Sequence, residues 1–272
     1  MRQLYGKNAL VTGGAMGMGK SLAGLLLREG ARVAIVDVRD AELESAREEL
    51  ARLGDVAAFK CDVTDRLAVY TLADRVREEF GTIDLLVNNA GIVKAHPLMD
   101  KPDELIELTV AVNLLAHFWT MKAFLPDMLA RRSGHIVNMA SAGGILGVPY
   151  ISDYCASKFG AIGLTESIRQ ELKLLGFKKI KVSYVCPNTV GTGMFAGNKP
   201  VKGTKMLEPE DVTTRIILGI KRGKERIYIP SSVYSAALLK AILPVPAMDL
   251  TSRLMGIATS SKAMTGRDIT VK

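Results

Sequence analysis

Residues 7–19 read KNALVTGGAMGMG, and this stretch decides the fold. Its first part, Lys7 to Thr12, is a short apolar run that predicts a buried β-strand and stops at Gly13. The turn Thr12-Gly13-Gly14-Ala15-Met16-Gly17-Met18-Gly19 then leads into apolar residues at helical spacing. Glycines permit a tight turn and let the backbone approach a pyrophosphate, which the N-terminus of the following helix attracts. The stretch therefore predicts the first strand, phosphate turn and helix of a dinucleotide-binding sheet.

The rest of the chain alternates short apolar runs with longer amphipathic segments. Helices are predicted at 18–27, 41–53 and 67–80 and through Met121 and Met128, and further strands at 33–37, 56–61, 83–87, 135–139, 180–185 and 226–230. We expect Asp40 to cap the helix at 41–53. Near-continuous apolar strands separated by helices are typical of a parallel sheet covered on both faces. The predicted fold class is α/β, a single-domain Rossmann fold with a doubly wound, seven-stranded parallel sheet.

Length sets the domain organisation. At 272 residues the chain suits one large α/β domain. We expect residues 1–230 to form the dinucleotide-binding and catalytic domain, with 186–210 as a lid over the substrate. Residues 231–272 are expected to form a helical tail that packs on the domain or on a partner subunit.

Charge and cysteine content narrow the class of function and the compartment. The net charge is +8, yet the basic residues are scattered and no basic motif is interleaved with aromatic residues, so we expect no nucleic-acid partner. Three cysteines without a Cys-x-x-Cys pattern are more typical of a reducing cytoplasm than of a disulfide framework. The early first strand leaves no room for a signal peptide, and no apolar run is expected to span a bilayer, so we expect a cytoplasmic protein. His96, His117 and His135 are isolated, so no metal site is predicted.

Asp37 ends the second predicted strand, about 20 residues beyond the glycines, where a carboxylate accepts hydrogen bonds from the adenosine ribose. The same charge would repel a 2′-phosphate. Val38 follows it, and the glycine turn holds no lysine or arginine before Lys20, although Arg39 lies close by. We therefore predict NAD rather than NADP as the cofactor.

Further motifs resemble those of the short-chain dehydrogenase/reductase family over roughly Lys7 to Pro230. Together with the glycine turn, they are Cys61-Asp62-Val63, Asn88-Asn89-Ala90-Gly91, Asn113, Ser141 and Tyr154-Cys155-Ala156-Ser157-Lys158. All of them occur in the family's order and spacing. The resemblance implies oxidoreductase chemistry with a nicotinamide cofactor, and a catalytic set of Asn113, Ser141, Tyr154 and Lys158.

The chemistry of Tyr154 and Lys158 supports this role, because residues four apart share one face of a helix. A tyrosine hydroxyl has a pKa near ~10 in water, too high for a base at neutral pH. The Lys158 ammonium and the charge of an oxidised nicotinamide would lower the pKa of Tyr154. Tyr154 is then the base in oxidation and the acid in reduction. By the resemblance, Ser141 holds the substrate oxygen, Asn113 supports a water relay to Lys158, and Lys158 also holds the nicotinamide ribose.

The predicted cofactor site combines the glycine turn, Asp37 and the family's motifs. By the resemblance, Asp62 and Val63 contact the adenine, Asn89 to Gly91 line the cleft, and Thr192 contacts the nicotinamide carboxamide. The predicted cofactor-binding residues are Gly13, Ala15, Met16, Gly17, Met18, Gly19, Asp37, Val38, Asp62, Val63, Asn89, Ala90, Gly91, Tyr154, Lys158, Pro187, Val190 and Thr192.

The segment Cys186-Pro187-Asn188-Thr189-Val190-Gly191-Thr192-Gly193-Met194-Phe195 follows the sixth predicted strand. By the resemblance it lines the nicotinamide and continues into a mobile lid. Asn188 stands where the family usually has glycine, and asparagine tolerates a left-handed backbone. Residues 142–150 are almost wholly apolar, which indicates a hydrophobic pocket wall. The predicted substrate-binding residues are Ser141, Gly143, Val148, Tyr154, Asn188, Met194 and Phe195.

The long tail after Pro230 resembles the branch of the family that holds retinol, 17β-hydroxysteroid and long-chain alcohol dehydrogenases. The predicted function is NAD-dependent interconversion of a primary or secondary alcohol and its carbonyl on an apolar substrate. Two alternatives stay open, an NADPH-dependent reductase of 3-oxoacyl thioesters and a non-catalytic NAD-binding protein. We expect a homodimer or homotetramer. The tail either packs on protein or makes a weak contact with a membrane surface.

Overall fold

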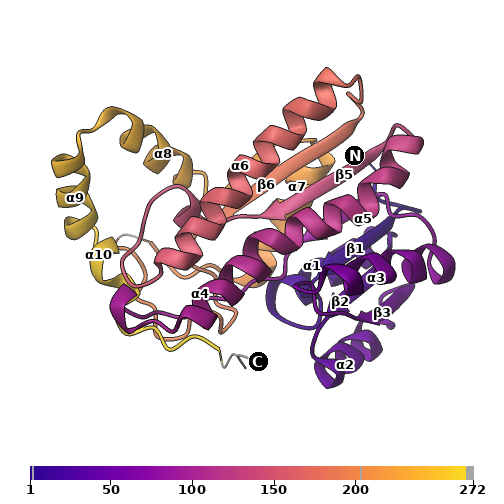
Figure 1. Ribbon diagram of the computed structural model, residues 1–272, viewed down its shortest axis with the longest axis horizontal. Coiled ribbons are helices and arrows are strands. Elements are labelled where there is room, and N and C mark those ends of the chain that lie inside the picture. The colour runs from indigo at the N-terminus through magenta and orange to yellow at the C-terminus, as the bar shows by residue number, and fades with distance from the viewer. Residues whose placement is uncertain (2, 203, 268–272) are drawn as a thin grey trace.

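The computed structural model describes residues 1, 3–202 and 204–267, and a seven-stranded sheet lies at its centre (Figure 1). The strand order is β3-β2-β1-β4-β5-β6-β7, and each neighbouring pair is parallel. This confirms the predicted α/β class with a doubly wound parallel sheet. The strands are β1 (Asn8–Thr12), β2 (Arg32–Asp37), β3 (Val56–Lys60), β4 (Leu85–Asn88), β5 (Gly134–Met139), β6 (Ile180–Pro187) and β7 (Arg226–Ile229).

Helices cover both faces of this sheet. They are α1 (Gly17–Arg28), α2 (Asp40–Leu50), α3 (Arg66–Glu79), α4 (Asp103–Val110), α5 (Ala116–Ala130), α6 (Ser152–Leu174), α7 (Pro209–Lys221), α8 (Val233–Ile242), α9 (Val245–Leu254) and α10 (Ile257–Ser260). Two 3-10 turns, η1 (Leu98–Asp100) and η3 (Ala142–Gly144), and one π-helix, η2 (Ala111–Leu115), complete the described elements.

Successive residues of a central strand point to opposite faces of the sheet. Ala9 and Val11 of β1 lie in a core with α1, α2 and α7, whereas Leu10 between them lies in a core with α3, α5 and α6. Because both faces are covered, both sets of side chains must be apolar. This explains why the strands read as unbroken apolar runs rather than as alternating ones.

The order of the strands reverses beside β1, since β2 and β3 lie on one side of it and β4 to β7 on the other. Ligands of such sheets bind outside the carboxyl ends of the strands at this point. The ends of β1 and β4 approach so closely here that a Cβ on Gly13 would lie 2.9 Å from Ala90 Cα. Gly13 also has a φ of 64°, so both its backbone conformation and its surroundings require glycine.

A buried polar network ties two helices to the carboxyl ends of β4 and β5. Asn88 Nδ2 donates to Asn138 Oδ1 at 2.8 Å, and Thr120 Oγ1 of α5 donates to Asn88 Oδ1 at 2.7 Å. Asn138 Nδ2 donates to Thr165 Oγ1 of α6 at 2.9 Å. Buried polar groups are costly unless they are paired, so this network fixes α5 and α6 relative to the sheet.

The prediction that Asp40 caps α2 is wrong by one residue. The helix begins at Asp40 itself, and the preceding Arg39 makes no side-chain cap hydrogen bond. The Asp40 carboxylate instead accepts from Lys60 Nζ of β3 at 2.9 Å. In the first turn it still favours the helix, because the N-terminus carries a partial positive charge.

The helical segment Asp103–Ala130 is longer and more apolar than we expected from the sequence. It joins α4, η2 and α5 over 28 residues, and an 18-residue window within it has a mean hydropathy of 1.3, so by length and composition the segment could cross a membrane. Its apolar side chains include Met121, Phe124 and Met128, which are buried in the core with α3 and the sheet. The burial of this face accounts for the apolar composition.

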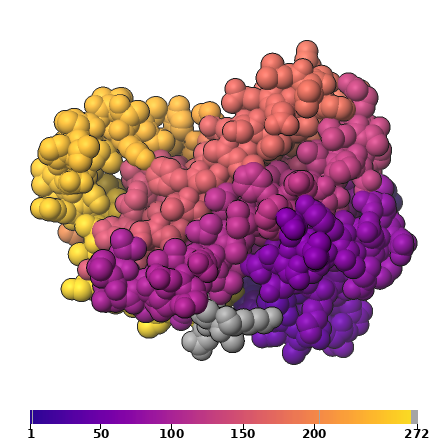
Figure 2. Space-filling model, viewed as in Figure 1, coloured from indigo at the N-terminus to yellow at the C-terminus, as the bar shows by residue number. Residues whose placement is uncertain are grey.

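The chain after β7 first leaves the sheet, and its end then contacts residues 196–199 and the loop after β4. Figure 1 shows α8 and α9 as an arc beside α6, and Figure 2 shows this arc as a separate lobe in gold. Its large apolar side chains are exposed at Leu238, Leu239, Ile242, Val245, Leu250 and Leu254. Met264, by contrast, is only 5% exposed. The predicted tail thus has an exposed part and a packed part, and its residues 268–272 lie outside the described residues.

Two buried histidines make the folded state sensitive to acid. His117 of α5 and His135 of β5 are almost wholly buried, and burial lowers the pKa of each to about 3. The unfolded chain takes up these protons near about pH 6.5, whereas the folded chain stays neutral down to about pH 3, so stability is lost as the pH falls through this window. At about pH 5, each histidine should reduce the free energy of unfolding by about 2 kcal/mol.

The variant His117→Leu should remove one of these two contributions. Between about pH 7.5 and about pH 5, its free energy of unfolding in urea should fall by about 2 kcal/mol less than that of the parent. Any effect of leucine on packing also changes the free energy of unfolding at the higher pH, so it cancels when the change between the two pH values is compared. Equal losses in the two proteins would mean that His117 takes up its proton in the folded chain as readily as in the unfolded one.

Candidate active site

A narrow cleft of about 30 Å³ lies at the carboxyl ends of the central strands. Apart from Met139 and Ala140, every residue that lines it belongs to the sets predicted from the sequence. The lining residues are Met18, Asn89, Gly91, Met139, Ala140, Ser141, Tyr154, Lys158, Pro187, Asn188, Val190, Met194 and Phe195.

Tyr154 and Lys158 lie on the buried face of α6 and are 4% and 3% exposed. Lys158 Nζ lies 5.7 Å from the centre of the Tyr154 ring and donates to the Met139 carbonyl at the end of β5 at 2.7 Å. Ser141 follows β5, and its hydroxyl is hydrogen-bonded to the Tyr154 phenol. The structure thus brings three of the four predicted catalytic side chains together at one end of the cleft.

Burial controls the protonation of this group. It raises the pKa of Tyr154, an effect that the hydrogen bond with Ser141 partly opposes. It also lowers the pKa of Lys158 to about 8, which leaves the amine mostly cationic at neutral pH. The predicted lowering of the Tyr154 pKa by Lys158 is therefore not what the folded chain alone produces, because desolvation of the phenolate outweighs it.

Asn113 lies behind the cleft in the π-helix η2, an irregularity that the sequence did not signal. Its Oδ1 accepts from Ile92 N at 2.8 Å, and its Nδ2 donates to Ile92 O at 2.9 Å and to Ser157 Oγ at 3.2 Å. A Cβ on Gly91 would lie 3.3 Å from Asn113 Oδ1 and 3.7 Å from Lys158 Nζ. Asn113 therefore holds the turn after β4 beside Lys158, and its role in a water relay stays a prediction.

The glycine turn has the geometry of a dinucleotide cradle. A Cβ on Gly19 would lie 2.0 Å from Gly13 O, and Gly17 has a φ of 56°, so neither position accepts a side chain without rearrangement. Asn89 Nδ2 donates to Gly13 O at 3.2 Å, and Thr12 Oγ1 accepts from Asn89 N at 3.0 Å. The first turn of α1 holds no acidic side chain, so its partial positive charge is open to a phosphate. These features fit the dinucleotide that the sequence predicted.

Asp37 is held firmly at the end of β2, where it is 6% exposed. Its Oδ2 accepts from Ala15 N at 3.3 Å, and its Oδ1 accepts from Val38 N at 2.9 Å. The side chain of Arg39 also reaches it, with Nε 3.4 Å from Oδ1. The carboxylate therefore lies beside the glycine turn as predicted, but with an arginine against it.

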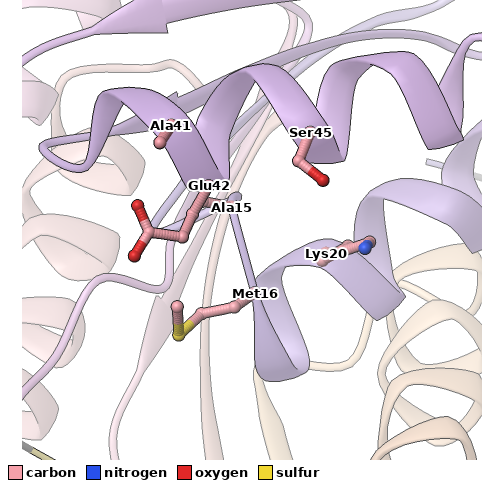
Figure 3. A pocket seen from close by; sticks show the side chains of 6 residues that line it. All are labelled: Ala15, Met16, Lys20, Ala41, Glu42 and Ser45. Carbon is pink, nitrogen blue, oxygen red and sulfur yellow. The ribbon is translucent and has the colours of Figure 1, made fainter.

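An open hollow of about 350 Å³ continues from this point between the start of α1 and α2. Figure 3 shows Met16 and Lys20 at the α1 side and Glu42 and Ser45 at the α2 side. Lys20 is paired with Glu49 at 2.6 Å, so its charge is balanced within the chain. The hollow adjoins the predicted position of the adenosine.

Asp62 and Val63 follow β3, which neighbours β2 in the sheet. Asp62 Oδ1 accepts from Thr64 N at 3.0 Å and from Thr64 Oγ1 at 2.7 Å, and Val63 is 8% exposed. The Asp62 carboxylate therefore stabilises its own turn. A contact of either residue with adenine stays a prediction.

The predicted lid packs against Tyr154. The Phe195 ring meets the Tyr154 ring edge to face with centres 5.9 Å apart, and Met194 packs in the same apolar cluster. Val190 is buried and pairs with Leu207 in an isolated bridge. Binding in the narrow cleft therefore requires the lid to move.

The expected left-handed backbone at Asn188 is absent. Among the described residues other than glycine, only Arg132 and Tyr150 have positive φ. Asn188 N instead donates to Ile229 O of β7 at 2.8 Å, which continues the pairing of β6 beyond Pro187. Asparagine at this position therefore needs no special tolerance.

Apolar residues surround the far end of the cleft. The cluster around Tyr154 holds Val93, Ile151, Cys155 and Met264, with Ala95, Val148, Met194 and Phe195 packed against it. Val148 N donates to Cys155 Sγ at 3.4 Å, and a Cβ on Gly143 would lie 3.4 Å from Tyr154 Cε1. The predicted wall residues Gly143 and Val148 thus lie close to the tyrosine, and Cys155 is buried in the same cluster.

Two further features of this site were not predicted from the sequence. Lys101 Nζ pairs with the carboxylate of Asp153, next to Tyr154, and the two side chains are 0% and 2% exposed. Lys101 also donates to Lys94 O at 2.9 Å, whereas Asp153 Oδ2 is buried without a partner. The second feature is the approach of Met264 and Arg267 from the tail. In both cases the contacting residues are far apart in the chain and carry no motif.

Replacing Lys101 with methionine should leave the Asp153 carboxylate buried without its cation. Removal of one partner from a buried ion pair costs about 3–5 kcal/mol, so Lys101→Met should lower the free energy of unfolding in urea by about that amount. The control is Lys60→Met, because Lys60 pairs with Asp40 in the open, at 59% and 71% side-chain exposure. Lys60→Met should lower the free energy of unfolding by no more than about 1 kcal/mol. An equal decrease in the two variants would contradict the burial of the Lys101–Asp153 pair.

Known proteins are similar to this chain over most of its length. The family model for short chain dehydrogenase matches residues 7–202. Epidermal retinol dehydrogenase 2 of Mus musculus is 38% identical over 271 residues, which cover 98% of this chain and 87% of the relative. Estradiol 17-beta-dehydrogenase 11 of Pongo abelii is 38% identical over 244 residues, which cover 89% of this chain and 81% of the relative.

Solved structures share the fold over nearly the whole chain. A short chain dehydrogenase/reductase from Burkholderia phymatum in complex with NAD has a TM-score of 0.82 and 26% identity, over 92% of this chain and 97% of that chain. A structure described as a putative short-chain dehydrogenase from Novosphingobium aromaticivorans has a TM-score of 0.78 and 28% identity, over 93% and 94% of the two chains. With the family model and the relatives, these structures show that the chain belongs to the short chain dehydrogenase family.

Proposed function

We propose that this protein is an NAD(H)-dependent oxidoreductase that interconverts an alcohol and its carbonyl on an apolar substrate of the steroid, retinoid or long-chain alcohol type. The observation that carries the proposal is the buried group of Ser141, Tyr154 and Lys158 between a glycine turn and an apolar wall. The relatives named as retinol and estradiol dehydrogenases support the class of substrate.

The residues of the cleft suit a proton transfer coupled to the oxidation or reduction. The nicotinamide, when bound, supplies or accepts the hydride. Ser141 donates a hydrogen bond to the substrate oxygen and so holds it beside the phenol. In reduction, the Tyr154 hydroxyl gives its proton to the carbonyl oxygen, and in oxidation the phenolate takes the proton of the alcohol. The Lys158 ammonium stabilises the phenolate in both directions.

The burial of Tyr154 and Lys158 keeps the Tyr154 phenol protonated, and this favours the reducing direction. A buried phenol with a raised pKa keeps its proton at neutral pH and can donate it. Because Lys158 has a pKa of about 8, it is charged below that pH and offsets the charge that the phenol acquires. Oxidation needs the phenolate at the start, so it should be favoured by higher pH.

The apolar wall supports a lipophilic substrate over a sugar. Val93, Ile151 and Met264 are buried around Tyr154, and Phe195 covers its ring. A sugar would leave its hydroxyl groups unpaired against these side chains, which costs free energy for each group. A steroid, retinoid or fatty chain has few polar groups to leave unpaired, and the transfer of its apolar surface from water to this wall is favourable in free energy.

The proposed preference for NAD rests on Asp37. Its carboxylate is buried at the glycine turn, where it would accept from ribose hydroxyls and repel a 2′-phosphate. Arg39 supports the alternative, NADPH, because its guanidinium reaches the same carboxylate and could turn toward a phosphate. An NADPH-dependent reductase of 3-oxoacyl thioesters is therefore the second candidate.

For its assembly we propose a homodimer or homotetramer. The exposed apolar side chains of α8 and α9 support a contact of this arc with a second subunit or with a membrane surface. Sedimentation analysis would detect a second subunit, and flotation with anionic lipid vesicles would detect binding to a membrane surface. A monomer that does not bind vesicles would contradict both contacts. A cytoplasmic location stays a prediction.

The central test is a screen of steroids, retinoids and fatty alcohols with NAD, followed by absorbance of the reduced cofactor. On the best substrate, Tyr154→Phe should lower kcat by at least about 100-fold, because general acid–base catalysis contributes about 100- to 10,000-fold. Its affinity for NADH should stay close to that of the parent, as measured by fluorescence. Tyr5→Phe is the control, since Tyr5 is 74% exposed and is not among the residues that line the cleft. Full activity of Tyr154→Phe would end the assignment of Tyr154.

A second test concerns the choice of cofactor. Asp37→Ala should reduce the ratio of kcat/KM for NAD to that for NADP at least about tenfold, since the repulsion of a 2′-phosphate contributes about 1.4 kcal/mol or more. The control Asp40→Ala removes an exposed carboxylate nearby and should leave the ratio unchanged. A parent enzyme that prefers NADPH would favour the second candidate, and an unchanged ratio in Asp37→Ala would assign the preference to another residue.

A further inference from the structure

The end of the described chain is attached to the lid by its backbone. Thr265 N and Gly266 N donate to Ala196 O at 3.0 and 3.2 Å. Gly197 has a φ of 79°, and a Cβ on it would lie 2.3 Å from Ala263 O. The two backbones therefore touch without side chains between them. The segment 263–267 and the lid form one layer over the cleft.

Two side-chain contacts hold the segment 263–267 against the apolar cluster around Tyr154 and the loop after β4. Met264 is 5% exposed and packs with Val93 and Tyr154 in the apolar cluster. Lys94 Nζ donates to Thr265 O at 2.9 Å. The segment is thus anchored both to the lid and to the turn after β4, and it carries the next side chain, Arg267, toward the glycine turn.

The Arg267 guanidinium lies between the glycine turn and the lid. Its Nη2 donates to the carbonyl of Thr192, and a Cβ on Gly17 would lie 3.1 Å from the same nitrogen. Its Nε would lie 3.7 Å from a Cβ on Gly193. Gly17 is the first residue of α1, so the guanidinium faces the end of the helix that the glycine turn presents to a phosphate.

The described groups around this position are mostly positive. The N-terminus of α1 carries a partial positive charge, and its first turn has no acidic side chain. Within residues 1, 3–202 and 204–267, no carboxylate lies within ion-pair distance of Arg267. Burial lowers the pKa of Arg267, and the charge of Arg39 lowers it further, while Asp37 opposes the shift. Among the described residues, two arginines and a helix N-terminus thus surround this space, and Asp37, which Arg39 already contacts, is the carboxylate that acts on Arg267.

We propose that Arg267 is a cofactor-binding residue supplied by the C-terminal segment, and that its guanidinium binds the pyrophosphate of the dinucleotide opposite the N-terminus of α1. Guanidinium groups form paired, charge-assisted hydrogen bonds with phosphate oxygens. The inference rests on the dinucleotide binding of the proposed function, but neither on the choice between NAD and NADP nor on the substrate. Arg267 lies well beyond residue 202, where the match to the family model ends.

The test measures binding of NADH by fluorescence and of ADP-ribose by competition, so it needs no turnover. ADP-ribose keeps the pyrophosphate and lacks the nicotinamide. Arg267→Ala should raise the Kd of both ligands by about 10- to 100-fold, the range expected for a lost hydrogen bond to a charged group. Arg267→Lys keeps the charge without the paired donors and should give an intermediate loss.

Arg253→Ala is the matched control, because Arg253 is an exposed arginine on the last turn of α9 in the same tail. It removes the same charge and should leave both Kd values unchanged. The urea midpoint of each variant is measured first. If Arg267→Ala is unfolded, Arg267→Gln, which keeps the length of the side chain, takes its place.

Three results would overturn the inference while leaving the proposed function intact. An unchanged Kd would remove Arg267 from the site. A loss confined to NADPH, whose binding is measured by fluorescence in the same way as that of NADH, would assign the guanidinium to the 2′-phosphate. Tighter binding by Arg267→Ala would mean that the guanidinium blocks the phosphate position. A parent protein that binds neither NADH nor NADPH would contradict the proposed function itself, and the inference with it.

Discussion

The burial of the Lys158 ammonium beside the Tyr154 phenol is the constraint on which the rest of the site depends. Removing an ammonium from water is costly unless it is hydrogen-bonded, and here the Met139 carbonyl accepts from it at 2.7 Å. That bond needs β5 and α6 in a fixed relative position, which the hydrogen bond between Asn138 and Thr165 secures. In such dry surroundings charges interact strongly, so a charge that enters the cleft has a large effect on the proton of the phenol.

The strands, the glycine turn and the motif residues could be predicted because each is encoded by a short, continuous stretch of sequence. The strand β1 and the turn after it combine an apolar run with glycines, and the structure shows that Gly13 is required both by its φ and by the approach of Ala90. The order of motifs then placed Ser141, Tyr154 and Lys158 in one cleft. The expected cap at Asp40 failed by one residue, because an N-cap and a first-turn aspartate have the same pattern in sequence.

Features that join distant segments could not be predicted in the same way. Lys101 and Asp153 form a buried ion pair across two separate segments, and neither residue stands in a motif. The π-helix that carries Asn113 interrupts an apolar helix without a glycine or proline within η2 to indicate it. The raised pKa of Tyr154 depends on how completely the lid and the tail exclude water, which only the packing of Phe195 and Met264 reveals.

The attachment of the tail to the lid has a practical consequence for handling the protein. The two ends of the described chain lie in different places, since Met1 donates to Ile220 O of α7 whereas Thr265 is bonded to the lid. An affinity tag after the last residue of this sequence would be joined, within a few residues along the chain, to the layer that covers the cleft. A tag at Met1 would precede β1, which enters the sheet from the edge opposite the strands' carboxyl ends. A tag at the amino terminus is therefore attached away from the lid and from the tail segment bonded to it.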